Sequence, residues 1–248
     1  MKPTIIVTST AKDAVGYAHR CTDSVRAAVR QTPASVRHIY SAADEATASD
    51  ALSTGGPQLE VRLSKSPALV NLLRMWSACQ PTDIIVHLDG DDRLTPRALV
   101  RVLDLYRDPN VWLTYGSFTR DDGILDYVWL PSFGQRHAYD VDPRKDSFRA
   151  SHLKTFRAGL VQHLITHHRD YLTSVHDGQL FDTCLDLAVM FPLLDLAGER
   201  YAVSQTVNVV YSYLHSEFAK GKRHAQTRRD DADIRARPRL PQLTERNW

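Results

Sequence analysis

The chain contains 248 residues, enough for one large α/β domain or two small ones. Its content of 43% hydrophobic and 24% charged residues is typical of a globular protein with a packed core. The sequence has no apolar stretch of about 18 residues and no secretory signal pattern at its start, which argues against membrane-spanning and secreted proteins. The three cysteines are widely spaced without metal-ligand spacing, so we expect buried thiols and a cytoplasmic location.

The net charge of +2 is unevenly distributed along the chain. Residues 219–248 contain nine Lys/Arg and four Asp/Glu, a net charge of +5, whereas residues 1–218 contain 22 and 25, a net charge of −3. A basic tail of this kind suits a polyanion or a membrane surface, although a solvated and weakly ordered end is the more common explanation. We therefore expect a single domain over residues 1–218 followed by a basic C-terminal tail.

Strand and helix patterns alternate through the first half of the sequence. Short apolar runs predict strands at 4–8, 36–40, 59–63, 83–88 and 111–118. Amphipathic stretches between them predict helices at 22–31, 67–80 and 97–107. The dipeptides Ser66-Pro67 and Thr95-Pro96 each supply an N-cap followed by proline at the first helical position. Strands separated by helices predict an α/β fold with a mostly parallel sheet and helices on both faces.

The second half of the sequence is less regular. Residues 119–150 are rich in Asp, Gly and Pro and predict a long loop. Helices are predicted at 151–172 and at 181–198, the second ending at Gly198. A strand is predicted at 207–214.

The predicted strand at 83–88 is followed by three carboxylates within four residues, Asp89, Asp91 and Asp92. A solvated turn is one explanation, because Asp and Gly are common in turns. A divalent cation such as Mg²⁺ or Mn²⁺ is the explanation that we favour, because carboxylate oxygens are the ligands of these ions and the ion offsets the repulsion between them. The polar stretch at 8–10 also follows a strand, so both segments are expected at the carboxyl edge of the sheet, where ligands of such folds bind.

An apolar strand followed by Asp-x-Asp-Asp and a helix resembles the metal-binding motif of family 2 glycosyltransferases of the GT-A fold. Other segments resemble, in the same order, the family's first strand, its first helix, its helix–strand–motif block and its acceptor-side helix with the following Tyr-x-Tyr strand. These segments are TIIVTST at 4–10, DSVRAAVRQT at 23–32, the block at 71–99 and the block at 181–213. The ordered set extends over most of the chain, up to about residue 216.

The resemblance implies a GT-A fold with a Rossmann-like sheet, in which residues 1–118 form the nucleotide-sugar-binding half and residues 119–218 the acceptor-binding half. It implies a metal-dependent glycosyltransferase that moves a sugar from a nucleotide diphosphate donor to an acceptor hydroxyl, with inversion assisted by an Asp base. Mn²⁺ or Mg²⁺ would stabilise the leaving diphosphate as a Lewis acid. A UDP-sugar is the expected donor, because UDP is frequent in the family.

The same resemblance assigns residues to three roles. The metal ligands would be Asp89, Asp91, Asp92 and His215. The donor would be bound by Thr8, Ser9, Thr10, Asp44, Asn71, Arg74, Asp89, Lys154 and Arg157. The base would be Asp186, at the start of the acceptor-side helix.

Structural roles are the alternatives for several of these residues. Asp182 and Asp186 share a helical face, where the first would cap the helix and the second would pair with an arginine. Asn71 and Arg74 also share a face and could equally tether a loop to their helix.

The sequence departs from the family at the end of the second predicted strand. The family has an Asp there that contacts the nucleobase, whereas this chain has Ser41 or Ala42, with Asp44 or Glu45 as substitutes in a shifted register. Because of this departure, the expectation that the nucleobase is uracil rests only on the frequency of UDP in the family.

The acceptor is suggested by a basic stretch at 144–169, whose single acid is Asp146 and whose cations are Arg144, Lys145, Arg149, Lys154, Arg157 and Arg169. Some of its members, such as His152, Lys154 or Arg157, would neutralise the donor diphosphate. Alternatively, the stretch and the tail would hold a polyanionic acceptor such as a hydroxymethylated base flipped out of DNA. We favour a glycan, protein or lipid hydroxyl. The rival of a different class is a non-catalytic α/β module that binds nucleic acid through these basic segments.

Overall fold

The structure, a computed structural model, describes residues 3–121, 128–129, 142–145, 148, 150–215, 224–246 and 248. The long loop predicted at 119–150 therefore lies largely outside the described residues, as do Asp146 and Arg149 of the basic stretch. Within the described ranges, no helix combines the length and the apolar character needed to cross a bilayer.

The described residues form one nine-stranded sheet in the order β3-β2-β1-β4-β8-β6-β9-β5, with β7 paired to β6. The strands are β1 (Ile5–Ala11), β2 (Val36–Ala42), β3 (Leu59–Leu63), β4 (Ile84–His87), β5 (Arg93–Leu94), β6 (Leu113–Arg120), β7 (Val128–Trp129), β8 (Lys154–Arg157) and β9 (Tyr201–Tyr211). Strands β1 to β4 are parallel, and β6 and β9 run in the same direction because β8 lies antiparallel between β4 and β6. The predicted mostly parallel sheet is confirmed.

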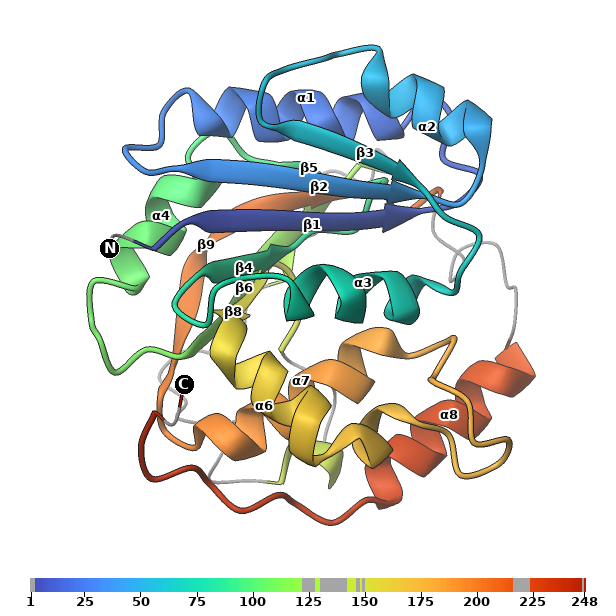
Figure 1. Cartoon of the computed structure of the whole chain (residues 1–248), viewed down its shortest axis with the longest axis vertical. Coiled ribbons are helices and arrows are strands. Elements are labelled where there is room, and N and C mark those ends of the chain that lie inside the picture. The colour runs from blue at the N-terminus through green and yellow to red at the C-terminus, as the bar shows by residue number, and fades with distance from the viewer. Residues whose placement is uncertain are drawn as a thin grey trace.

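Helices cover both faces of this sheet, as predicted. They are α1 (Ala18–Val29), α2 (Glu45–Leu52), α3 (Ala68–Ser77), α4 (Ala98–Leu105), α6 (Ala158–His167), α7 (Leu185–Ala197) and α8 (His224–Ala236), with short 3-10 helices η1 (Pro143–Lys145) and η2 (Arg169–Leu172). Figure 1 shows α1 and α2 above β1, β2 and β3, with α3 below these strands and α6, α7 and α8 beyond it on the same side.

Alternation along the strands divides the core into two clusters, one on each face. In β4, Ile84 and Val86 pack with the α1 and α4 cluster, whereas Ile85 packs with the α3, α6 and α7 cluster. Successive side chains of a strand point to opposite faces, so a strand buried on both sides must be apolar at every position. This requirement explains the continuous apolar run that leads to the acidic loop.

The structure corrects two predicted elements and adds a helix. The segment at 151–172 is not one helix, because β8 occupies Lys154–Arg157 before α6 begins. The backbone hydrogen bonds of β8 come from its pairing with β4 and β6. These tertiary contacts outweigh the local preference of the sequence for a helix. Strand β9 is longer than predicted, and α2 was not predicted at all.

The C-terminal segment is not a solvated end in the residues described. Helix α8 buries Ile234, and Leu240 and Trp248 pack against the same cluster as α6 and α7. Arginines of the segment are paired internally: Arg235 with Asp231, Arg237 with Asp233 and Arg239 with Asp195. In the described part of the segment, three of its nine Lys/Arg residues are therefore paired within the fold.

Candidate metal and donor site

The acidic residues at 89–92 form the loop between β4 and β5, at the carboxyl edge of the sheet. Gly90 has no room for a side chain. An added Cβ would lie 2.8 Å from the Ala11 Cβ, the Thr10 carbonyl oxygen and the Tyr40 hydroxyl. The Gly90 N–H donates to the Thr10 carbonyl at 3.1 Å, and the Tyr40 hydroxyl donates to the Gly90 carbonyl at 2.8 Å. The loop is thus fixed against the ends of β1 and β2.

Nitrogen groups surround the Asp89 carboxylate. Its Oδ1 lies 3.1 Å from His87 Nε2, and its Oδ2 lies 3.2 Å from His152 Nε2 and 3.8 Å from Lys154 Nζ. Burial alone would raise the pKa of Asp89, but the Lys154 ammonium and hydrogen bonds with the two histidines outweigh it and hold this pKa well below its usual range. Asp89 is therefore ionised at neutral pH.

Asp92 is fully buried and only half satisfied. Its Oδ1 accepts a hydrogen bond from the Ser212 N–H at 2.8 Å, whereas its Oδ2 has no hydrogen-bond partner among the residues that the structure describes. Burial and the nearby charges of Asp91 and Asp89 raise the pKa of Asp92 well above its usual range. An orphaned buried carboxylate oxygen is costly, and a bound cation is one arrangement that offsets the cost.

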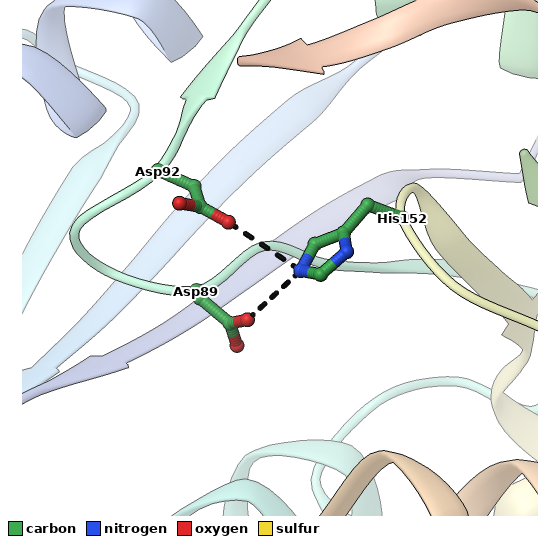
Figure 2. Close-up of side chains that lie close together, drawn as sticks. All are labelled: Asp89, Asp92 and His152. Carbon is green, nitrogen blue, oxygen red and sulfur yellow. Dashed lines mark hydrogen bonds and ion pairs between the residues drawn. The ribbon is translucent and has the colours of Figure 1, made fainter. Parts of the chain in front are cut away.

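Asp89, Asp92 and His152 each offer a ligand atom, and these atoms lie within 4.8 Å of one another. Figure 2 shows both carboxylates directed at His152 Nε2, which lies 3.5 Å from the orphaned Asp92 oxygen. Without a cation, Nε2 carries the proton of the hydrogen bond that Asp89 Oδ2 accepts. With the proton on Nδ1 instead, 2.8 Å from Ser151 Oγ, Nε2 would offer its lone pair to a cation. Carboxylate oxygens and an imidazole nitrogen suit Mn²⁺ or Mg²⁺, so these residues fit the metal that the sequence analysis expected.

The other two expected ligands lie beside this cluster. His215 Nε2 is 3.9 Å from Asp91 Oδ2, and its ring stacks on Tyr17 with 4.3 Å between ring centroids. The Ser212 hydroxyl donates to the Asp91 carbonyl at 2.6 Å. The end of β9 therefore brings His215 to the acidic loop, as the sequence analysis expected.

Lys154 and Asp186 meet at the same edge. Lys154 Nζ lies 2.5 Å from Asp186 Oδ1, and the Asp186 side chain keeps 28% of its surface exposed. Burial would lower the pKa of Lys154, but Asp186 and Asp89 outweigh it and raise this pKa, so the ammonium stays charged. Asp186 is thus paired with a lysine and not with an arginine, the partner expected if its role were structural.

The stretch at 8–10 belongs to β1 and is less available than expected. Thr8 and Ser9 are buried, and their hydroxyls are engaged by Trp76 Nε1 at 3.0 Å and by His38 Nε2 at 3.1 Å. These contacts occupy both hydroxyls, and the expected donor role of Thr8 and Ser9 remains a prediction. Thr10 is half-buried and adjoins the acidic loop through its carbonyl.

Asp44 caps α2 and is fully engaged. Its carboxylate accepts from the Thr47 N–H at 2.7 Å, from the Thr47 hydroxyl at 2.8 Å and from the Asp13 N–H at 3.0 Å. Burial tends to raise the pKa of Asp44, but these hydrogen bonds outweigh it and lower this pKa. Asp44 therefore holds the loop between β1 and α1, and its expected role at the donor base remains a prediction.

Asn71 and Arg74 tether the loop that precedes α3. The Ser64 hydroxyl donates to Asn71 Oδ1 at 2.8 Å, the Asn71 amide donates to the Ser66 carbonyl at 3.0 Å, and Arg74 donates to the Ser66 hydroxyl at 3.2 Å. These contacts match the tethering alternative for the pair.

Arg157 lies away from the acidic loop. The register of β8 against β4 pairs Lys154 with His87 but Arg157 with Ile84, about 10 Å farther along the strand. Arg157 donates to the Thr82 carbonyl at 3.2 Å. Its expected role in neutralising the donor diphosphate remains a prediction, and the register does not favour it, because Arg157 lies three residues along β8 from Lys154.

His152 was not assigned as a metal ligand from the sequence. The sequence analysis proposes His152 only as a residue that neutralises the donor diphosphate. It lies there within the helix predicted at 151–172, and that prediction gives no reason to expect it near the acidic loop. The structure places it just before β8, beside β4. Lys154, Thr155, Phe156 and Arg157 show no period-two alternation, so the sequence has no clear strand signal at this point.

Comparison with known proteins identifies solved structures with a similar fold. No protein-family model matches the sequence, and no curated protein sequence matches it. Solved structures do match. Mannosyl-3-phosphoglycerate synthase from Rubrobacter xylanophilus has a TM-score of 0.62 at 15% identity, covering 99% of this chain and 78% of its own. TarS residues 1–349 from S. aureus has a TM-score of 0.59 at 9% identity, covering 85% of this chain and 61% of its own.

A third match is glucosyl-3-phosphoglycerate synthase from Mycobacterium tuberculosis, crystallised with Mn²⁺, UDP-glucose and glycerol 3-phosphate. Its TM-score is 0.56 at 12% identity, covering 94% of this chain and 79% of its own. This chain thus spans about three-fifths of the TarS fragment and about four-fifths of the two synthases. At such identities the likeness concerns the fold, and the chain has the fold of the GT-A glycosyltransferases.

Proposed function

We propose that the protein is a metal-dependent glycosyltransferase that transfers a sugar from a nucleotide diphosphate donor, by default a UDP-sugar, to an acceptor hydroxyl. The observation that carries this proposal is the orphaned carboxylate oxygen of Asp92, buried beside Asp89 and His152 in a fold of the GT-A type. A degenerate binding module would have no need to keep an unsatisfied buried carboxylate beside two further acids.

The metal would be held by the acidic loop and by a histidine. Asp89, Asp91 and Asp92 supply oxygen atoms, and His152 and His215 lie within reach of them. When bound, the cation supplies a Lewis acid for the leaving diphosphate. The chain itself contributes the fixed geometry of the loop, which Gly90, Tyr40 and the end of β9 determine.

Asp186 is proposed as the base that accepts the proton of the acceptor hydroxyl in an inverting displacement. Its position in the first turn of α7, partly exposed and close to the Lys154 ammonium, supports this role. A general base needs an accessible carboxylate oxygen within hydrogen-bond reach of the acceptor. Because Lys154 engages Oδ1, Oδ2 is the oxygen available for this proton.

The structural neighbours support UDP and Mn²⁺ as the first ligands to try. TarS residues 1–349 has been crystallised with UDP and with UDP-GlcNAc, and the mycobacterial synthase with Mn²⁺ and UDP-glucose. The acceptor is proposed as a glycan, protein, lipid or small hydroxyl compound. A nucleic acid is the weaker choice, because the C-terminal segment packs on the core through Ile234, Leu240 and Trp248 and three of its arginines pair with carboxylates.

The test is a panel of nucleotide-sugars incubated with Mn²⁺ and scored for the released nucleotide diphosphate. Release should require Mn²⁺ and be abolished by EDTA and by Asp91→Asn. Asp23→Asn, a change at an exposed carboxylate that pairs with Arg26, is the control and should release nucleotide at the wild-type rate. UDP with Mn²⁺ should also raise the melting temperature, since a ligand of the folded state stabilises it. A melting temperature raised by DNA and by no nucleotide would contradict the proposal.

A further inference from the structure

One buried ammonium links two carboxylates that come from different halves of the chain. Lys154 Nζ lies 2.5 Å from Asp186 Oδ1, at the start of α7, and 3.8 Å from Asp89 Oδ2, in the acidic loop. The Lys154 side chain is only 2% exposed, so its charge is compensated by protein groups more than by water. Its position is fixed by the register of β8, which sets Lys154 opposite His87.

The two contacts of Lys154 are unequal. The contact with Asp186 is a short charge-assisted hydrogen bond, whereas the contact with Asp89 is an ion pair beyond hydrogen-bond distance. Among the described residues, Lys154 supplies the hydrogen bond that orients the Asp186 carboxylate. Asp186 in turn holds the ammonium away from Asp89. The Asp89 carboxylate then stays available as a ligand for a divalent cation.

We propose that Lys154 is a positioning residue that holds Asp186 in place and competes with a divalent cation for the Asp89 carboxylate. This inference rests on the proposed function, because it places the cation at the acidic loop. It differs from the role that the sequence suggested for Lys154, which was direct neutralisation of the donor diphosphate. The base and the metal loop are coupled through this one ammonium, so a change at either carboxylate alters the other.

The physical consequence is opposite to that of a donor-binding lysine. Removing a positive charge close to a cation site strengthens binding of the cation, because two like charges no longer repel. Removing Asp186 leaves Lys154 with Asp89 as its remaining partner, and the lysine then competes more strongly with the cation. Part of the Asp186 effect is direct, because a negative charge is lost, and this part is the same whether or not Lys154 is present.

The test measures binding of Mn²⁺ alone by calorimetry in a double-mutant cycle of the full chain. Lys154→Met should bind Mn²⁺ about fivefold more tightly than wild type, and Lys154→Arg should bind it as wild type does, because the charge is kept. Asp186→Asn should bind Mn²⁺ about threefold or more weakly than wild type, with a clearly smaller effect in the Lys154→Met background. Arg107→Met, which removes a charge of the same sign from an 82% exposed side chain, is the control and should change nothing.

The outcomes separate the inference from the proposed function. Equal or weaker Mn²⁺ binding by Lys154→Met, or an equal effect of Asp186→Asn in both backgrounds, overturns the coupling. A wild-type chain that binds no Mn²⁺ overturns the proposed metal site itself, and the coupling with it. If Lys154→Met fails to fold in a melting experiment, Lys154→Gln replaces it in the cycle with the same expected results.

Discussion

Asp92 Oδ1 accepts a hydrogen bond from the Ser212 N–H at 2.8 Å, across 120 positions of the chain. This bond fastens the acidic loop to the end of β9 and fixes one carboxylate oxygen, while the other has no hydrogen-bond partner within the described part of the chain. The neighbouring Ser212 hydroxyl holds the Asp91 carbonyl in the same way. A strand from the second half of the chain thus organises a loop from the first half.

Asp92→Asn should stabilise the metal-free protein and weaken its metal binding. Asparagine can still accept the hydrogen bond from Ser212, while the repulsion among three clustered carboxylates is reduced. We expect the melting temperature without metal to rise by about 2–8 °C, as a gain of about 1–2 kcal/mol gives for a chain of this size. Calorimetry with Mn²⁺ should show an affinity at least about tenfold lower. Asp23→Asn is the matched control, and a variant that melts earlier than wild type while binding Mn²⁺ normally would contradict both halves of this prediction.

Gly90→Ala should damage the site through lack of space. Its Cβ would lie 2.8 Å from the Thr10 carbonyl oxygen and from the Ala11 Cβ, neither of which is the end of a flexible side chain. The loop must therefore move, and we expect a loss of about 1–3 kcal/mol in the free energy of unfolding, the usual cost of overpacking. Urea denaturation measures this loss, and Mn²⁺ binding should weaken in parallel. Wild-type values in both measurements would show that the loop is not packed as described.

His38 should make stability depend on pH. Its side chain is buried against Ser9, and burial lowers the pKa of His38 to about 3. The unfolded chain binds a proton near pH 6.5 while the folded chain does not, so this contribution is complete above pH 6.5 and is lost as the pH falls toward 3. Relative to His38→Gln, the wild type should lose up to about 1.4 kcal/mol per pH unit across that window. Parallel stability curves for the two proteins between pH 7 and pH 4 would rule out a neutral buried histidine.

Asp195 should be important for the attachment of the C-terminal segment. It is fully buried in α7 and accepts from Arg144 at 3.1 and 2.6 Å, from Arg239 at 3.0 Å and from the Leu240 N–H at 3.1 Å. Asp195→Ala leaves the buried Arg144 guanidinium without this partner, and we expect a loss of about 3–5 kcal/mol in the free energy of unfolding. Asp104→Ala removes an exposed partner of Arg107 and should cost less than about 1 kcal/mol. Similar losses for the two variants in urea denaturation would argue against the buried pair.

The strongest sequence predictions came from local patterns whose physical reason can be stated from neighbouring residues alone. Strand β4 must be apolar at every position because both faces are covered, and an acidic loop directly after it has no role in packing. The cluster of Asp89, Asp91 and Asp92 could therefore be found without coordinates. The weakest prediction was the helix at 151–172, because the strand β8 exists through pairing with β4 and β6, which lie far away in the sequence.

The sequence could propose polar residues near strand ends for the site, but it could not distinguish those that reach the acidic loop from those that are engaged elsewhere. Thr8 and Ser9 turned out to be engaged with Trp76 and His38, and these partners are distant in sequence. Arg157 is set apart from Lys154 by register, since three residues along β8 separate the two. The C-terminal segment was predicted as a basic tail because the partner of Arg239, Asp195 in α7, is identified only by packing.

Local patterns by themselves determined the α/β class, the alternation of strands and helices in the first half, and the position of the acidic loop, because each depends on neighbouring residues of the chain. Only the tertiary structure decided which side chains meet that loop: His152 and Lys154 from β8 and its approach, Ser212 and His215 from the end of β9. The physical reason is that a site made of charges is defined by distances of a few ångströms. Those distances are set by sheet register and helix packing, which connect residues more than a hundred positions apart.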